Sequence, residues 1–249
     1  MTDPRLAPKS EDYSQSHLQR GGTYDEALAS VPFDAYMAQL EKEFLLARIP
    51  ILFPHGKPRY LDFACGTGRI MQTVAPLCSE SIGVDVSETM LAEAQMKCPS
   101  VQFLQADVTR QDVDLGSFDL ITSFRFFGNA QQKLRVAVLE VLHRLLKSDG
   151  YLIINSHRNP RSLATMLTRL SGGDYAGVDL HFSGLKRLLR STGFEIVTTK
   201  PIGVWMYRSK LMQDVNADSA HARKMESRFG SALFTPIAPD AVIVARKIS

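Results

Sequence analysis

Three aspartates, Asp62, Asp85 and Asp107, follow short apolar runs at intervals of 23 and 22 residues. These intervals fit successive strand–helix units of a parallel sheet, which would place the three carboxylates side by side at the carboxyl ends of adjacent strands. Carboxylates there can accept charge-assisted hydrogen bonds from an ammonium, from the two hydroxyls of a ribose and from the exocyclic amine of adenine. The spacing therefore predicts a site for an adenosine-containing cofactor.

A glycine turn follows the first of these strands, with the sequence Ala64-Cys65-Gly66-Thr67-Gly68. Gly66 and Gly68 leave room for a cofactor and permit positive φ, so we expect the five residues of this turn to contact it. A dinucleotide fingerprint would require a further glycine and a helix N-terminus directed at a pyrophosphate, but position 71 is Met. A nicotinamide-dependent oxidoreductase with a degenerate fingerprint is therefore the weaker alternative.

S-adenosylmethionine offers a partner to each of the three carboxylates. Asp62 would take the α-ammonium directly or through a water, Asp85 the ribose hydroxyls, and Asp107 the adenine amine. The same aspartates could instead cap helices or open turns, an interpretation that is weaker for three in register than for one. Other strand ends supply further expected cofactor contacts, namely Val86, Ala106, Val108 and Ser123.

These motifs resemble those of the class I S-adenosylmethionine-dependent methyltransferases, well over about residues 55–200 and loosely over the remainder. The family's turn usually has three glycines, and Ala64 stands in place of the first. Residues 139–154 are similar to the family's fourth helix and fifth strand, with Ser148-Asp149-Gly150 instead of Pro-Gly-Gly. The resemblance implies an α/β fold with a Rossmann-like, seven-stranded, mostly parallel sheet, helices on both faces and an antiparallel last strand.

Length and composition agree with a cytoplasmic enzyme of this kind. The chain has 249 residues, a net charge of +3 and three scattered cysteines without a CxxC pair, which indicates a reduced, intracellular protein. We interpret Cys65, inside the turn, as small filler rather than a nucleophile. No apolar run suits export or a membrane span, and the small net charge argues against a nucleic-acid surface.

The sequence before the first strand predicts a polar, flexible arm over residues 1–21 and a helical lid over residues 22–55. Apolar residues recur with helical spacing from Phe33, and Pro50 is the expected end of that helix. In the resembling family such a helix commonly covers the cofactor. Tyr24 is the expected lid contact, whereas Tyr36 fits a buried stripe.

The rest of the chain completes a single domain, residues 22–249. A cofactor-binding core over residues 56–200 alternates helices with predicted strands near 59–64, 81–86, 101–106, 118–123, 150–156 and 194–199. Residues 201–239 read as an insertion that covers the substrate, with a helix within 216–229. The last strand follows within residues 240–249, from about 240 to 247.

The methyl acceptor would lie beyond the carboxyl ends of the fourth and fifth strands. His157, just past the fifth strand, is the candidate general base, because a histidine of ordinary pKa is mostly neutral at cellular pH; the alternative is a histidine that orients a loop. Arg125, at the fourth strand end, requires a carboxylate or phosphate partner from the substrate or the protein. His181 is a weaker candidate, as the N-cap of a helix over 181–192 or as a second pocket histidine.

Motifs that the sequence lacks narrow the acceptor. After the fourth strand there is no Asn/Asp/Ser-Pro-Pro-aromatic motif for a base amine and no carboxylate for a catalytic Mg²⁺, and no cysteine pair ends a strand. We expect transfer to a hydroxyl, or an amine, of a small molecule or a sugar- or glycan-type acceptor, without a metal. One alternative is an RNA methyltransferase with a basic face made of Arg158, Arg161, Arg169, Lys186, Arg187 and Arg190. A non-catalytic cofactor-binding protein is less attractive, because the set of cofactor residues is intact.

Overall fold

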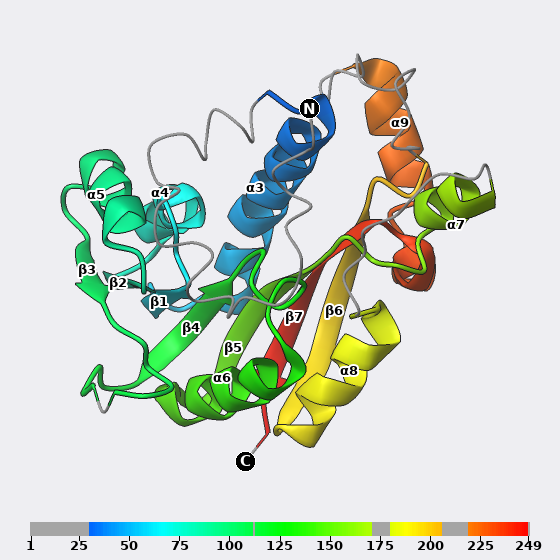
Figure 1. Ribbon diagram of the computed structural model, residues 1–249. Coiled ribbons are helices and arrows are strands. Elements are labelled where there is room, and N and C mark those ends of the chain that lie inside the picture. Colours follow the sequence, from blue (N-terminus) through cyan, green and yellow to red (C-terminus); the bar gives the residue numbers. More distant parts are fainter. Residues whose placement is uncertain (1–29, 112, 171–179, 206–218, 249) are drawn as a thin grey trace.

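The computed structural model describes residues 30–111, 113–170, 180–205 and 219–248. Its centre is a seven-stranded sheet in the order β3-β2-β1-β4-β5-β7-β6 (Figure 1). Neighbouring strands pair in parallel except for β7, which runs antiparallel to β5 and β6. The predicted fold class is confirmed. The strands are β1 Arg59–Phe63, β2 Glu80–Asp85, β3 Gln102–Gln105, β4 Phe118–Ser123, β5 Leu146–His157, β6 Phe194–Ile202 and β7 Asp240–Lys247.

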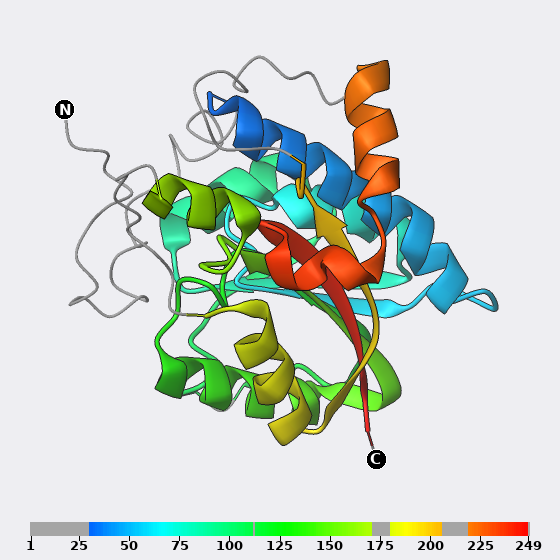
Figure 2. The same cartoon turned by 90° about the vertical axis from the view of Figure 1, so that its right-hand side faces the viewer.

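Helices cover both faces of the sheet, as the two perpendicular views show (Figures 1 and 2). One face carries α3 (Pro32–Leu52), α4 (Arg69–Val74) and α5 (Glu88–Lys97), and the other carries α6 (Gln132–Leu145) and α8 (Phe182–Ser191). Two more helices, α7 (Leu163–Leu170) and α9 (Ala220–Arg228), lie near the end of the sheet where β5 ends, with the short 3-10 helix Ala232–Ile237 before β7. A second 3-10 turn, Ala75–Leu77, follows α4.

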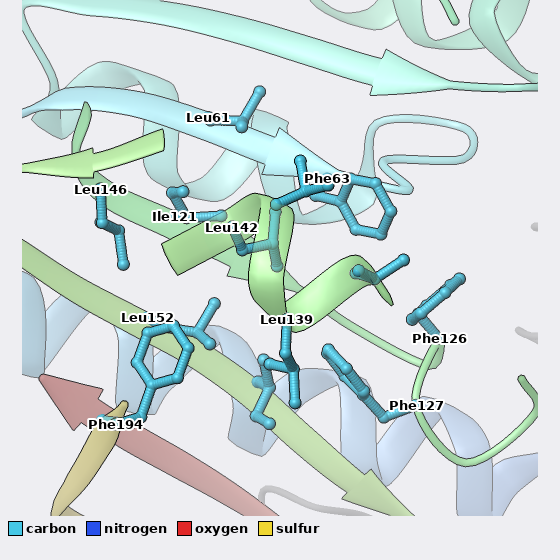
Figure 3. Close-up of a cluster of buried hydrophobic side chains, with 14 of the residues drawn as sticks. Leu61, Phe63, Ile121, Phe126, Phe127, Leu139, Leu142, Leu146, Leu152 and Phe194 are labelled. Carbon is cyan, nitrogen blue, oxygen red and sulfur yellow. The ribbon is translucent and has the colours of Figure 1, made fainter. Parts of the chain in front are cut away.

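The larger core lies between the central strands and α6 (Figure 3). Leu139 and Leu142 project from one side of α6 and are fully buried against Leu61 and Ile121 of β1 and β4. This apolar stripe, repeated every three or four residues, fixes the helix on the sheet. Phe126 extends the cluster past the carboxyl end of β4, so the same core supports the segment that the sequence assigns to the acceptor site.

The second core lies under α3. Tyr36, Met37, Leu45 and Ile49 are buried on one side of that helix and pack with residues of the central strands. α3 also buries Glu41, a charged residue that is 0% exposed. The helix therefore belongs to the body of the fold, and it carries a charge into the interior that requires a partner.

Two elements differ in extent from the prediction. α3 does not end at Pro50 but continues to Leu52, and the Phe53 amide still donates to the Ile49 carbonyl at 3.1 Å. A proline so close to a helix end removes a single helical hydrogen bond and does not end the helix. β5 begins at Leu146 rather than at 150, because Leu146 already pairs with Phe118 of β4; the register then shifts, and Asp149 has a φ of 61°.

The C-terminal elements lie near the predicted positions. β6 reaches Ile202, three residues beyond the expected end, and β7 has the expected bounds. The helix of the insertion is α9, which Ser219 caps by accepting a hydrogen bond from the Ala222 amide at 3.1 Å. Residues 1–21, Tyr24 and positions 206–218 of the insertion lie outside the described residues. Among the helices that the structure describes, none is long and apolar enough to cross a membrane.

Candidate active site

A cleft opens at the carboxyl ends of β1, β2, β3 and β4. It brings together ten of the thirteen predicted cofactor-binding residues: Asp62, Ala64, Cys65, Gly66, Thr67, Asp85, Val86, Ala106, Asp107 and Val108. Gly68 and Ser123 are not among the lining residues, and Tyr24 is outside the described part of the chain. Ser123 is fully buried at the end of β4. The three aspartates thus share one cleft, as their spacing predicts.

Gly66 and Gly68 of the turn are required for different structural reasons. Gly66 has a φ of +53°, and a Cβ there would meet only the Met90 sulfur, at 3.6 Å, so this residue keeps the cleft open. Gly68 has a φ of +77°, and its Cβ would come within 3.0 Å of the Ala94 Cβ on α5. The expectation that Gly68 leaves room for the cofactor is therefore corrected: the space beside it is filled by α5.

Asp62 is a buried carboxylic acid of the cleft with a raised pKa. It is 1% exposed, and the Thr122 hydroxyl on the facing residue of β4 donates to its Oδ1 at 2.6 Å. Oδ2 is buried without a hydrogen bond within the described residues. Burial raises the pKa of Asp62 to about 7, although the Thr122 hydrogen bond and the nearby Arg69 charge act in the opposite direction. An ammonium group is the kind of partner that this carboxylate lacks.

Asp85 at the end of β2 holds the turns on either side of it. Its Oδ2 accepts from the Gly66 amide at 2.8 Å and its Oδ1 from the Ser87 amide at 2.9 Å. Each carboxylate oxygen has a second lone pair, so the group can also accept from two hydroxyls. Asp85 is both a structural residue of the glycine turn and a candidate ribose acceptor.

Asp107, after β3, opens a turn. Its Oδ1 accepts from the Thr109 amide at 3.0 Å and from the Thr109 hydroxyl at 2.6 Å, and its Oδ2 lies 3.6 Å from Arg110 Nε. Asp107 therefore opens a turn through its Oδ1, as the alternative interpretation of this aspartate expects. The residue still lines the cleft, so the two roles coexist.

Cys65 points away from solvent. Burial raises the pKa of its thiol well above the usual range, and its sulfur lies 3.1 Å from the position that a Cβ on Gly83 would occupy. A protonated thiol that packs against the neighbouring strand is a poor nucleophile, which supports the interpretation of Cys65 as a small packing residue.

Arg125 lies on the acceptor side of the cleft with a left-handed backbone, φ 61°. Asn155 on β5 fixes this conformation, since its Oδ1 accepts from the Arg125 amide at 2.6 Å. The guanidinium lies 3.9 Å from Asp34 on α3, so the protein itself supplies a carboxylate to this arginine. A strained residue at a strand end that lines a cleft indicates a functional position.

His157 is buried, 6% exposed, and does not line the cleft, which corrects the expectation that it lies over the pocket. Its Nδ1 is 2.7 Å from Asp240 Oδ2, on the facing residue of β7. Burial, with the charges of Arg125 and Arg158, holds the pKa of His157 well below its usual range, so the ring is neutral. His181 caps α8: its Nδ1 accepts from the Gly184 amide at 2.9 Å.

Several lining residues were not predicted from the sequence, among them Arg69, Ile70, Met90 and Thr109. Arg69 directly follows the glycine turn, and this adjacency was a usable signal. Met90 lies on α5, and its approach to Gly66 arises from helix packing that the sequence does not display. Within the described residues, no group of three or more His, Cys, Asp or Glu side chains is arranged to hold a metal ion.

Comparisons with known proteins agree with this geometry. Residues 61–150 match the family model described as a methyltransferase domain. The chain is 32% identical over 141 residues to the putative methyltransferase YqeM of Bacillus subtilis, covering 54% of this chain and 52% of that protein. It is 28% identical over 153 residues to the ubiquinone/menaquinone biosynthesis C-methyltransferase UbiE of Campylobacter jejuni, covering 59% and 63%. The chain thus spans about half to two thirds of the length of these curated relatives.

Among solved structures, the chain is similar to the N-methyltransferase NodS of Bradyrhizobium japonicum in complex with S-adenosyl-L-homocysteine. The TM-score is 0.59 at 15% identity, with 96% of this chain and 100% of that chain covered. Magnesium protoporphyrin IX methyltransferase of Synechocystis with bound SAH gives a TM-score of 0.57 at 16% identity, covering 86% and 84%. Residues 61–150 are therefore similar in sequence to a methyltransferase domain, and the fold of the chain is similar to that of solved S-adenosylmethionine-dependent methyltransferases.

Proposed function

We propose that this protein transfers a methyl group from S-adenosylmethionine to a hydroxyl, or an amine, of a small molecule or a sugar-type acceptor. The observation that carries the proposal is the convergence of Asp62, Asp85 and Asp107 on one cleft. A cofactor with an ammonium, a ribose diol and an adenine amine along its length satisfies all three carboxylates. A dinucleotide has no ammonium group that could donate to Asp62.

The residues present fit this cofactor. The buried Oδ2 of Asp62 awaits a donor, and the bare Gly66 backbone leaves space beside Met90. Asp85 would hold the ribose and Asp107 the adenine amine, with Val86, Ala106 and Val108 as apolar walls. When bound, the cofactor supplies a methyl group that a positively charged sulfur already activates, so the protein must align the acceptor and exclude water.

For a hydroxyl acceptor, we propose His157 as the general base with Asp240 as its positioning residue. The hydrogen bond to Asp240 engages Nδ1 and leaves Nε2 as the proton acceptor of a neutral ring. The acceptor oxygen forms its bond to the methyl carbon as its proton passes to Nε2, and the electron pair of the broken bond remains on sulfur. Because His157 is buried and does not line the cleft, this step requires that the acceptor gain access to Nε2.

We further propose that the insertion covers the acceptor. α9 is tied to α3 by a hydrogen bond of 2.8 Å from the Tyr36 hydroxyl to Glu226 and by an ion pair between Arg223 and Glu43. The indole N–H of Trp205 also donates to Glu226, at 2.8 Å. These contacts hold the two helices together at the end of the sheet where the acceptor is expected.

Calorimetry tests the cofactor assignment. S-adenosylhomocysteine should bind with micromolar affinity, and Asp85→Ala should weaken it at least about tenfold because two charge-assisted hydrogen bonds are lost. Asp114→Ala is the matched control: this exposed aspartate also accepts from a turn glycine amide, Gly116 at 3.1 Å, but lies outside the cleft. Equal affinities of the two variants would show that Asp85 does not bind the ribose.

A mass-shift screen identifies the acceptor. Metabolite extracts incubated with isotopically labelled cofactor should yield a product with the added methyl group, and His157→Gln should depress its formation while cofactor affinity stays unchanged. Unchanged turnover in that variant would retire His157 as the base. A carbon-methylated quinone among the products would instead place the chain functionally beside its quinone-biosynthesis relatives.

The RNA alternative has less support. Arg158, one of the six residues of its predicted basic face, has a left-handed backbone (φ 57°) and a buried Nε. Arg158 is thus partly buried, and its charge acts on His157.

A further inference from the structure

The cleft also contains a positively charged side chain, Arg69, to which no role has yet been assigned. Arg69, the first residue of α4, lines the cleft, and its side chain is 24% exposed. Arg69 and Asp62 line the same cleft, and the positive charge of Arg69 lowers the pKa of Asp62 against the larger effect of burial. We propose that Arg69 binds the α-carboxylate of the cofactor's amino-acid moiety, an inference that rests on the proposed function.

The chemistry of that moiety explains the choice. Its ammonium and its carboxylate are bonded to the same carbon, so their protein partners must be neighbours. The cleft offers such a pair in the carboxylate of Asp62 and the guanidinium of Arg69. A guanidinium is the side chain that binds a carboxylate best, through charge-assisted and often bidentate hydrogen bonds.

Arg125 is the other arginine of the cleft, and the structure separates it from this role. Its guanidinium lies 3.9 Å from Asp34 and its charge lowers the pKa of His157, whereas the charge that lowers the pKa of Asp62 is that of Arg69. The two arginines therefore divide the cleft, with Arg69 at the amino-acid end of the cofactor and Arg125 on the acceptor side.

Glu41 holds Arg69 in place. Its Oε2 lies 2.9 Å from Arg69 Nη1, and its Oε1 accepts from Asn155 Nδ2 at 2.8 Å. A guanidinium carries five N–H donors, so this pair leaves donors for a second carboxylate. Because Glu41 is fully buried on α3, that helix contributes to the cofactor site through a fixed charge and not only as a cover.

Two ligands that differ only in the carboxylate test the proposal. Affinities for S-adenosylmethionine and for its decarboxylated analogue are measured by calorimetry on the full chain and on Arg69→Ala. The variant should bind S-adenosylmethionine at least about tenfold more weakly and the decarboxylated analogue within about twofold of the parent. Arg246→Ala is the matched control, since Arg246 also pairs with a glutamate, Glu195 at 3.2 Å, at a distance from the cleft.

Removing Arg69 alone leaves Glu41 as an uncompensated buried charge, which can unfold the protein. The double variant Glu41→Gln/Arg69→Gln contains no buried charge at these positions and should show the same selective loss. A loss that is equal for both ligands, or no loss, overturns the assignment of Arg69. If the parent chain binds neither ligand, the proposed function is wrong, and the inference about Arg69, which rests on it, is wrong as well.

Discussion

The imidazole of His157 and the carboxylate of Asp240 lie 2.7 Å apart, on facing residues of the antiparallel strands β5 and β7. The two residues are 83 positions apart in the chain and both are buried. They join the end of the cofactor-binding core to the start of the last strand.

The buried imidazole of His157 makes the stability of the protein depend on pH, because burial and the charges of Arg125 and Arg158 lower its pKa. The folded-state pKa of His157 is lowered, so below about pH 6.5 the unfolded chain binds a proton that the folded chain does not, and stability falls as pH falls. In His157→Gln that loss disappears. Urea unfolding should show that the variant's penalty is larger at pH 7.5 than at pH 5.5, whereas the exposed His55→Gln should show no such trend. A penalty independent of pH would mean that His157 titrates normally.

The affinity for the cofactor should rise with pH. Asp62 has a pKa of about 7 in the free protein, and only its ionised form can pair with an ammonium. Below pH 7 the affinity for S-adenosylhomocysteine should fall by up to about tenfold per pH unit, with proton release that calorimetry detects in buffers of different ionisation enthalpy. Asp62→Asn should remove the slope. The same group stabilises the free protein at low pH, and this contribution is lost as pH rises from about 4 to about 7.

Alanine substitutions of Gly68 and Gly66 should have different effects on stability and on cofactor binding. Gly68→Ala places a Cβ 3.0 Å from the Ala94 Cβ at a φ of +77°, so we expect a loss of about 2–4 kcal/mol in the free energy of unfolding. Gly66→Ala meets nothing closer than 3.6 Å and should cost only about 1–2 kcal/mol from its positive φ, but it should weaken cofactor binding. Urea unfolding and calorimetry on both variants separate packing from binding. Similar losses of stability would contradict the distinction.

Ala64 has a φ of 54°, a conformation that glycine adopts at lower cost. Ala64→Gly should therefore raise the free energy of unfolding by up to about 1 kcal/mol. Ala75→Gly, at a residue with a φ of −53°, is the control and should destabilise by about 1 kcal/mol. A destabilised Ala64→Gly protein would show that the turn does not strain this alanine.

Glu226 accepts hydrogen bonds from the Tyr36 hydroxyl, from the Trp205 indole and from the Gly203 amide, at 2.8, 2.8 and 3.2 Å. Glu226→Ala leaves these buried donors unpaired, so we expect a loss of about 3 kcal/mol or more in stability. The emission of Trp205, the single tryptophan, should shift to the red as α9 detaches. Arg223→Ala, which removes a partly exposed ion pair, should cost less than about 1 kcal/mol. An unshifted emission in Glu226→Ala would show that α9 docks without this carboxylate.

The sequence alone determined the cofactor half of the protein. Asp62, Asp85 and Asp107 could be placed because strand ends of a parallel sheet share one edge, so a regular interval along the chain becomes a neighbourhood in space. The bounds of β7 followed from a short apolar run between polar residues, and both turn glycines have the positive φ that their type favours.

Only the tertiary structure decided which side chains reach the cleft. Gly68 proved to be a packing residue because α5 lies against it, and His157 proved to be buried because β7 brings Asp240 to its ring. Glu41 joins Arg69 although 28 residues separate them. Such contacts depend on how helices and an antiparallel strand dock, and local periodicity carries no record of a partner that is distant in the chain.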